Sequence, residues 1–191
     1  MRMLSLLIFY IIAFLSYPSI AAADQFDQEL NWLEFGARMD DFESIPEPAN
    51  SAMLRGSWHM GEGFSLYAES ASGSFDLPGE PDHVLNALGI GLSEAASQDI
   101  YGTLSGIVYA HKIGTVTDKY ALLRYSIHGH TDSGLAWGIG VQGLFAADLR
   151  EGLGFYLGGE FRFSKKIALS LEANSDKELI SYQAGIRWYF N

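Results

Sequence analysis

The residues with the clearest potential for chemistry are a serine and two histidines spaced two apart, Ser126, His128 and His130. Alternate residues of a β-strand point to one face, so these side chains would share a face. A histidine that contacts a serine can act as the general base of a hydrolase or acyltransferase. Positions two apart on a strand are separated by about 7 Å, beyond direct hydrogen-bond reach. We therefore keep Ser126 and His128 as catalytic candidates but expect no enzyme.

The glycines of Gly138-x-Gly140-x-x-Gly143 match the spacing of a dinucleotide-binding motif. That motif requires a strand that passes into a helix, whose N-terminus holds the pyrophosphate. Here the motif lies within an alternating strand pattern with no helical pattern after it. We therefore predict no cofactor and interpret these glycines as packing positions.

The histidines do not suggest a metal site. His128 and His130 are expected near one end of a strand and His111 near the other end of its neighbour, some 25 Å away if the strands cross a bilayer. His59 belongs to a distant strand. Ligands of one ion must converge on a common point, so these residues predict no metal centre.

Two further observations limit the chemistry. The chain has no cysteine, which excludes disulfides, thiol catalysis and cysteine-based zinc sites. His83, at the start of a predicted strand, and the acidic residues Asp40, Asp41 and Glu43 of the predicted loop 40–50 would attract divalent cations only loosely. We interpret them as parts of solvated acidic loops.

Alternation of apolar and polar residues is the main structural signal and indicates β-strands throughout. It is clearest at the C-terminus, where Ile180, Tyr182, Ile186 and Trp188 share one face. No proline falls within a predicted strand. The pattern predicts ten strands, with eight as the alternative if one hairpin is misassigned: 31–39, 51–60, 63–70, 83–92, 100–111, 120–130, 134–145, 153–163, 167–174 and 179–190.

The charged residues within these strands all fall on the face opposite the large apolar residues. A charge that faces lipid at mid-depth costs roughly 2–4 kcal/mol, so the charged face must line an enclosed interior. We predict an all-β, antiparallel, up-and-down transmembrane β-barrel with a nearly neutral interior network. Its members are Glu34, Arg38, Arg55, Glu69, Arg124, Glu160, Arg162, Glu172 and Arg187.

Aromatic residues near strand ends provide a second check on this strand order. In a ten-stranded barrel all four tryptophans fall at the same rim, where an indole ring can be half buried in lipid. We predict that the membrane-interface anchors are Trp32, Trp58, Trp137, Trp188 and Phe190.

The N-terminus has the features of a secretory signal. Arg2 precedes an apolar run, Leu4–Leu15, and Ala21-Ala22-Ala23 offers a cleavage site. The run is shorter than the roughly 18 residues of a membrane-spanning helix. We predict a signal peptide at 1–23 and a single barrel domain at 24–191. The proline-containing loops 40–50 and 71–82 would then face outward.

The net charge of −11 argues against a nucleic-acid partner. In its predicted strands, signal peptide and charge, the chain resembles the small outer-membrane β-barrel proteins of Gram-negative bacteria, in the OmpA-like or porin-family grouping. The resemblance rests on the signal peptide, the ending Gly185–Phe190 and the Gly-aromatic run Gly158–Phe163. It implies an outer-membrane location and insertion by the barrel assembly machinery, which recognises a terminal aromatic strand.

The resemblance leaves the function open, because such barrels include channels, adhesion proteins, structural barrels and a few lipid-modifying enzymes. We expect a structural or interaction barrel with a side-chain-filled lumen and at most a narrow diffusion pathway. Its partners would be outer-membrane lipid and an extracellular partner at loops 40–50 and 71–82. The alternatives are a lipid-modifying enzyme and a soluble exported barrel that binds a small apolar ligand.

Overall fold

The computed structural model describes residues 31–79, 81–131, 133–146, 151–176 and 178–190. The predicted signal peptide, 1–23, lies outside the described residues.

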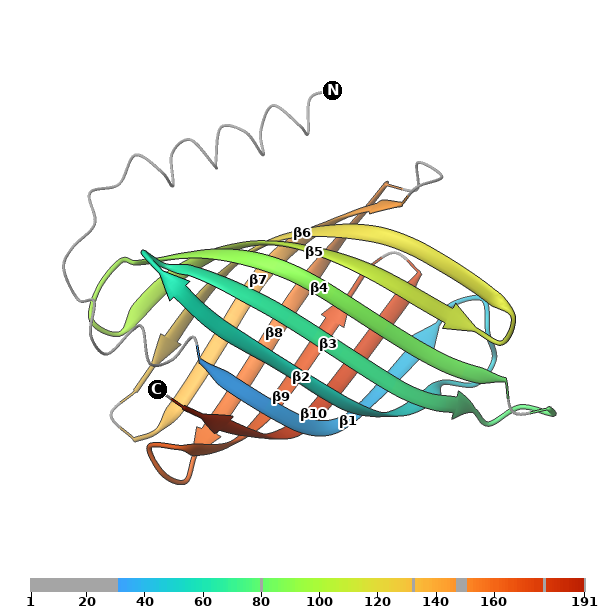
Figure 1. Ribbon diagram of the computed structural model, residues 1–191, viewed down its shortest axis with the longest axis horizontal. Helices are drawn as coiled ribbons and strands as arrows, with labels where there is room; N and C mark the ends of the chain where they lie inside the picture. The colour runs from blue at the N-terminus through green and yellow to red at the C-terminus, as the bar shows by residue number, and fades with distance from the viewer. Residues whose placement is uncertain (1–30, 80, 132, 147–150, 177, 191) are drawn as a thin grey trace.

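Ten antiparallel strands form a closed barrel in which each strand pairs with its neighbours in sequence and β1 pairs with β10 (Figure 1). Closure leaves no unpaired strand edge. The prediction of ten strands is confirmed, and the eight-stranded alternative is wrong. The strands are β1 (Trp32–Phe42), β2 (Ala49–Gly61), β3 (Phe64–Phe75), β4 (Asp82–Ala95), β5 (Ile100–Ile113), β6 (Val116–His130), β7 (Leu135–Ala146), β8 (Glu151–Arg162), β9 (Ile167–Ser175) and β10 (Leu179–Tyr189).

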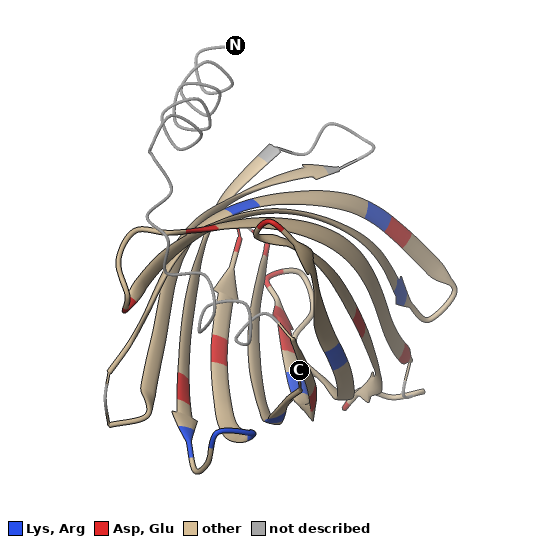
Figure 2. Cartoon of the chain, turned by 60° about the vertical axis from the view of Figure 1, so that its left-hand side comes forward, with Lys and Arg blue, Asp and Glu red and all other residues tan. Residues whose placement is uncertain are grey.

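The two ends of the barrel are distinguished by the connections that they carry. The terminal end holds the start of β1, the end of β10 and the connections after β2, β4, β6 and β8. The far end holds the connections after the odd-numbered strands. Charged residues appear as separate bands along the strands and at the turns rather than as one continuous patch (Figure 2).

Several strands extend further toward the far end than predicted. β1 runs to Phe42 and β3 to Phe75, so the predicted loops 40–50 and 71–82 shorten to the segments between β1 and β2 and between β3 and β4. Apart from Phe75 at its end, the extra residues of β3 are alanine, glycine or serine, and they pair through backbone hydrogen bonds that require no apolar side chain. Asp40 and Asp41 are therefore strand residues, not loop residues.

The outward face of the barrel is apolar around its circumference. Phe35 on β1 and Phe155 on β8 are each 67% exposed, and Ile90 on β4 is 62% exposed. Such a continuous surface exceeds what soluble monomers tolerate. Within the described ranges, no helix is long and apolar enough to span a membrane.

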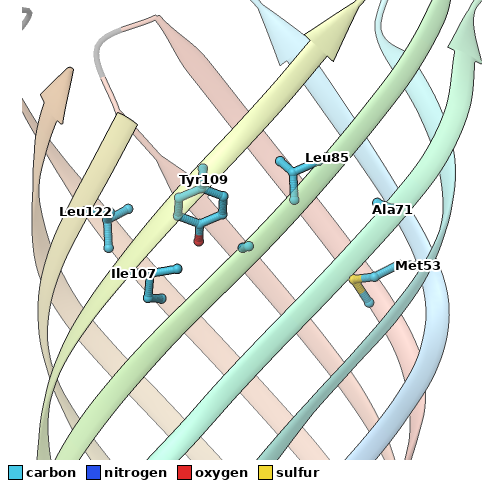
Figure 3. Packing of buried hydrophobic residues seen from close by; sticks show 7 residues of the cluster. Met53, Ala71, Leu85, Ile107, Tyr109 and Leu122 are labelled. Carbon is cyan, nitrogen blue, oxygen red and sulfur yellow. The ribbon is translucent and has the colours of Figure 1, made fainter. Parts of the chain in front are cut away.

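The inward face has two different walls. Most of the charged side chains lie on β1, β2 and β8–β10, whereas the wall from β2 to β6 carries a buried apolar cluster beside Glu69 and Arg124 (Figure 3). The predicted interior was polar, and this cluster was not predicted, because strands such as β4 carry apolar residues on both faces. The members of the cluster are Met53, Ala71, Leu85, Ala87, Ile107, Tyr109 and Leu122.

Candidate functional site

Arg55 is the centre of the charged wall. It lies directly opposite Glu34 in the β1–β2 register, and its Nε and Nη2 donate to Glu34 Oε1 at 3.1 and 2.8 Å. Its Nη1 and Nη2 donate to the two oxygens of Glu172 on β9 at 2.7 and 2.8 Å. Nη1 also donates to Gln183 at 2.5 Å. One guanidinium thus joins strands from opposite sides of the closure between β1 and β10.

Arg187 on β10 extends this network toward the terminal end. It forms ion pairs with Glu34 at 2.8 Å, with Glu172 at 2.9 Å and with Glu160 at 3.0 Å. Glu34 is fully buried, and its carboxylate bridges Arg55 and Arg187. Buried charges are tolerated only when they are paired and hydrogen-bonded in this way.

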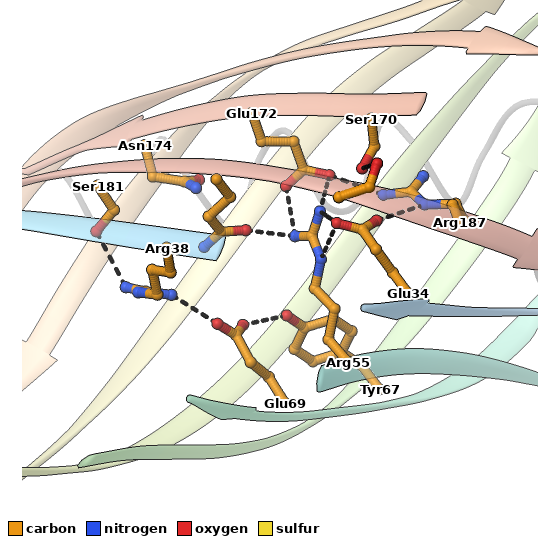
Figure 4. A network of polar contacts seen from close by, with 12 residues as sticks. Glu34, Arg38, Arg55, Tyr67, Glu69, Ser170, Glu172, Asn174, Ser181 and Arg187 are labelled. Atoms are coloured by element: carbon orange, nitrogen blue, oxygen red, sulfur yellow. Dashed lines mark hydrogen bonds and ion pairs between the residues drawn. The ribbon is translucent and has the colours of Figure 1, made fainter. Parts of the chain in front are cut away.

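Arg38 holds a second group of charges nearer the far end. Its Nε lies 2.8 Å from Asp40 Oδ2, its Nη1 lies 2.7 Å from Glu69 Oε1, and its Nη2 donates to Ser181 at 3.0 Å. Tyr67 donates to the other oxygen of Glu69. These contacts connect β1, β3 and β10 across the lumen (Figure 4).

The remaining two arginines pair with amides, a carboxylate and aromatic rings. Arg124 donates to Gln142 at 3.1 Å and to Asn174 at 2.7 Å. Its guanidinium lies 4.5 Å from the ring centroid of Tyr156. Arg162 pairs with Glu160 at 2.7 Å.

The structure places all nine predicted network residues on the inward face, and it adds Asp40 to them. Five arginines then face five acidic side chains. Sequence reasoning missed Asp40 because the strand was ended at Met39. The available signal was the spacing of Glu34, Arg38 and Asp40, all of one parity.

The network leaves little open space in the middle of the barrel. A cavity of about 180 Å³ at the terminal end is lined by Tyr101, Ser126 and His128, among others. Between Arg38, Arg55 and Glu69 the free volume is only about 30 Å³. A buried water needs about 10–15 Å³ on this measure, so the mid-lumen has room for a few waters at most.

One predicted membrane anchor is wrong. The ring of Trp32 faces the lumen, with the guanidinium of Arg187 4.1 Å from its centroid and that of Arg55 at 5.6 Å. Trp32 has the same parity as Glu34, which strand alternation requires to point inward. Trp58, Trp137 and Trp188 are exposed on the outward face, and Phe190 is half-buried just after β10.

The predicted separation of Ser126 and His128 is also wrong. Ser126 Oγ lies 2.8 Å from His128 Nε2. The spacing of about 7 Å applies to the backbone, and the imidazole is long enough to lean back along β6. Tyr101 stacks on His128 at 4.9 Å between centroids. Among the described contacts, none joins His128 to a carboxylate, whereas His130 lies 3.4 Å from Asp99.

The glycine motif lies within β7, as predicted. Gly138 pairs with His128 across the β6–β7 ladder, and a Cβ atom at Gly138 would lie 2.7 Å from His128 Nδ1. Here the absence of a side chain makes room for the imidazole. In its β7 setting the motif has no helix N-terminus to hold a pyrophosphate.

The interpretation of Asp40 and His83 as part of a solvated acidic loop region is wrong. Both are fully buried strand residues inside the far end of the barrel. His83 Nε2 lies 3.1 Å from Asp40 Oδ2 and 2.7 Å from Nε2 of His111 on β5. His111 lies near the far end, as predicted, but its contact with His83 was not predicted, because the metal-site argument compared only His59, His111, His128 and His130.

Comparison with known proteins supports the fold. The sequence matches no protein-family model and no curated protein. Among solved structures, the NanC porin aligns with a TM-score of 0.54 and 10% identity over 83% of this chain and 100% of that chain. The KdgM porin in complex with disordered oligogalacturonate aligns with a TM-score of 0.50 and 10% identity, covering 84% and 99%. These matches support the porin part of the predicted resemblance and do not single out an OmpA-like protein.

Proposed function

We propose that this chain is an integral outer-membrane β-barrel whose lumen is closed by its ionic network, with a structural or interaction role and at most a slow diffusion pathway. The observation that carries the proposal is the division of faces: large apolar side chains point outward on every side, and paired charges point inward. Large apolar side chains on the outer surface are stabilised by contact with lipid, whereas their exposure to water is unfavourable.

This division argues against the soluble alternative. A soluble barrel that binds an apolar ligand would turn its large apolar residues inward and its arginines and glutamates outward. The apolar cluster on β2–β6 has that character, but its side chains pack against one another and against Tyr67 and Tyr120.

The closed interior limits any diffusion role. Two solved porins share the fold, which supports some passage of solute. The middle of this barrel, however, is crossed by Arg38–Glu69 and Arg55–Glu172 ion pairs at 2.7 Å, and a hydrated ion would have to displace them. We therefore expect closed or very small channels rather than open pores.

The membrane location defines the partners that we propose. Lipid covers the outward face, the barrel assembly machinery inserts the chain, and the signal at 1–23 directs its export. With the terminal end in the periplasm, the connections after β1 and β3 face outward. They are the proposed contact sites for an extracellular partner.

Single-channel recording on refolded protein tests the closed lumen. The charge-balanced variant Arg55→Ala/Glu172→Ala removes the central pair and should produce larger and more frequent conductance steps. A matched control is Asp118→Ala/Lys119→Ala, because both residues are exposed near the far end of β6. Wild type and control should show little or no conductance. Porin-like steps from wild-type protein would show that the lumen is open.

The Ser126–His128 contact supports a second candidate function, hydrolysis of a small ester in the terminal-end cavity. The nucleophile and base are within hydrogen-bond reach, and both line that cavity. Their inward orientation would admit a substrate from the terminal end rather than a lipid from the bilayer. The described residues provide no carboxylate to orient His128, so the barrel without enzymatic activity remains our proposal.

A further inference from the structure

We propose that Asp40, His83 and His111 form a binding site for one divalent transition-metal ion of the Zn²⁺ type inside the far end of the barrel. Each offers one ligand atom, and the three atoms lie within 4.8 Å of one another. The site is separate from the arginine–glutamate contacts that close the lumen at Arg55. It does not depend on the membrane location, because the ligands are enclosed by the barrel in any solvent.

The ligands come from three strands that are not all adjacent. His83 on β4 and His111 on β5 are neighbours in the sheet, whereas Asp40 is on β1, with β2 and β3 between it and His83. The side chains meet because they turn into the enclosed lumen. His83 and Asp40 are fully buried and His111 is 4% exposed.

A glycine on β3 lies between His83 and its hydrogen-bond partner Ser51. Gly73 lies between Ser51 and His83 in the β2–β3–β4 register. A Cβ at Gly73 would lie 1.8 Å from the carbonyl oxygen of Asn50, so only glycine fits. With no side chain there, His83 Nδ1 reaches across β3 to Ser51 Oγ at 2.7 Å.

This contact orients the imidazole for metal binding. Metal-bound histidines generally donate their second ring N–H to a polar partner, which fixes the tautomer. When Nδ1–H donates to Ser51, Nε2 carries the lone pair, and it points at Asp40 and His111. When His111 also presents its Nε2 lone pair, three ligand lone pairs converge in a dry site, where a single cation can accept all of them.

Asp40 is held as a carboxylate by its other contacts. Arg38 Nε lies 2.8–2.9 Å from its two oxygens, and Ser181 donates to Oδ1 at 2.5 Å. Oδ2 keeps a lone pair directed at His83. The single positive charge of Arg38 is shared between Asp40 and Glu69, so these three side chains together carry one net negative charge when both histidines are neutral.

The donor set specifies the class of ion. Two imidazoles and a carboxylate suit Zn²⁺, Cu²⁺, Ni²⁺ or Fe²⁺ rather than Ca²⁺ or Mg²⁺. Tetrahedral ligands at 2.0–2.1 Å from zinc lie about 3.3 Å apart. The two Nε2 atoms lie 2.7 Å apart and His83 Nε2 lies 3.1 Å from Asp40 Oδ2, so these two pairs need to open by only a few tenths of an ångström to admit the ion.

Aromatic rings cover the site. Phe42 lies 5.3 Å from His111 and Phe75 lies 5.7 Å from His83, measured between ring centroids. They separate the imidazoles from bulk water, which strengthens charge interactions with a bound ion. Three protein ligands leave one position for a water, as in open zinc sites.

Metal binding by the refolded full-length mature chain tests the proposal. Protein stripped with a chelator is titrated with Zn²⁺ and analysed for bound metal after gel filtration. We expect one equivalent with micromolar or tighter affinity. Cu²⁺ bound to wild-type protein should give electron paramagnetic resonance couplings from two imidazole nitrogens, a readout that requires no variant.

Variants assign the site. His111→Gln and His83→Gln should each abolish the two-imidazole signal, and Ser51→Ala should weaken Zn²⁺ binding about 10–100-fold. The controls His59→Gln and His130→Gln, at the terminal end, should bind like wild type. Heat-dependent gel mobility selects folded samples. The proposal is overturned if folded wild type retains no Zn²⁺, or if binding disappears in the controls and survives in His111→Gln.

Discussion

Glu34 and Arg55 occupy directly paired positions on β1 and β2, and a single oxygen of Glu34 accepts from two nitrogens of Arg55 at 2.8 and 3.1 Å. The other oxygen accepts from Arg187 at 2.8 Å. One fully buried carboxylate thus neutralises parts of two arginines on strands at either side of the β1–β10 closure. This arrangement makes Glu34 the residue whose loss should most disturb the interior.

We expect Glu34→Gln to destabilise the barrel by about 3–5 kcal/mol, because it leaves buried positive charge without its partner. The free energy of unfolding in lipid vesicles, measured by tryptophan fluorescence in urea, checks this value. The control Glu47→Gln changes an exposed residue between β1 and β2 and should stay within about 0.5 kcal/mol. Equal effects of the two changes would contradict the bridging role of Glu34.

The orientation of the tryptophans predicts different access to lipid. In variants that retain one tryptophan each, nitroxide-labelled lipids should strongly quench Trp58, Trp137 and Trp188, which are exposed on the outward face. Trp32 lies against Arg187 in the lumen and should be quenched only weakly. Strong quenching of Trp32 would show that its ring faces lipid, as the sequence alone suggested.

The outward face predicts a cost for charge that depends on depth. Val141 lies near the middle of β7 and is exposed, so Val141→Arg should cost about 2–4 kcal/mol in vesicles. Ile167 begins β9 at the terminal end, and Ile167→Arg should cost about 0–1 kcal/mol near the interface. A similar cost at both positions would argue against a bilayer around the barrel.

The Ser126–His128 contact predicts a negative result in a labelling experiment. Without a carboxylate among the described contacts to orient His128, we expect a fluorophosphonate probe to leave Ser126 unmodified in folded protein. Mass spectrometry of the treated barrel gives the readout, with Ser126→Ala as the background. Modification of wild type that is absent in Ser126→Ala would favour the hydrolase.

Strand alternation made most of the fold predictable. The period of two fixed which residues face inward, and the placement of charges fixed which face is enclosed, so all nine network residues lie where they were expected. The same rule would have placed Trp32 in the lumen, since it precedes Glu34 by two. The expectation that tryptophan prefers an interface took precedence there, and it was wrong.

Contacts across the lumen could not be predicted in the same way. The meeting of Asp40 with His83 depends on closure of the barrel and on the space above Gly73, and neither is visible in the local pattern. Likewise, the Ser126–His128 hydrogen bond depends on side-chain torsions within one strand face. The apolar cluster around Leu85 could not be predicted from alternation, because apolar residues lie on both faces of β4.

The absence of cysteine in the chain permits the most direct test of the lipid-facing surface. Single spin labels at Ile139, at Leu157 and at Glu47 in the connection after β1 are compared in vesicles for collisions with oxygen and with a water-soluble nickel complex. We predict high oxygen and low nickel access at Ile139 and Leu157, and the reverse at Glu47. Nickel access at Ile139 and Leu157 equal to that at Glu47 would contradict a membrane-embedded barrel.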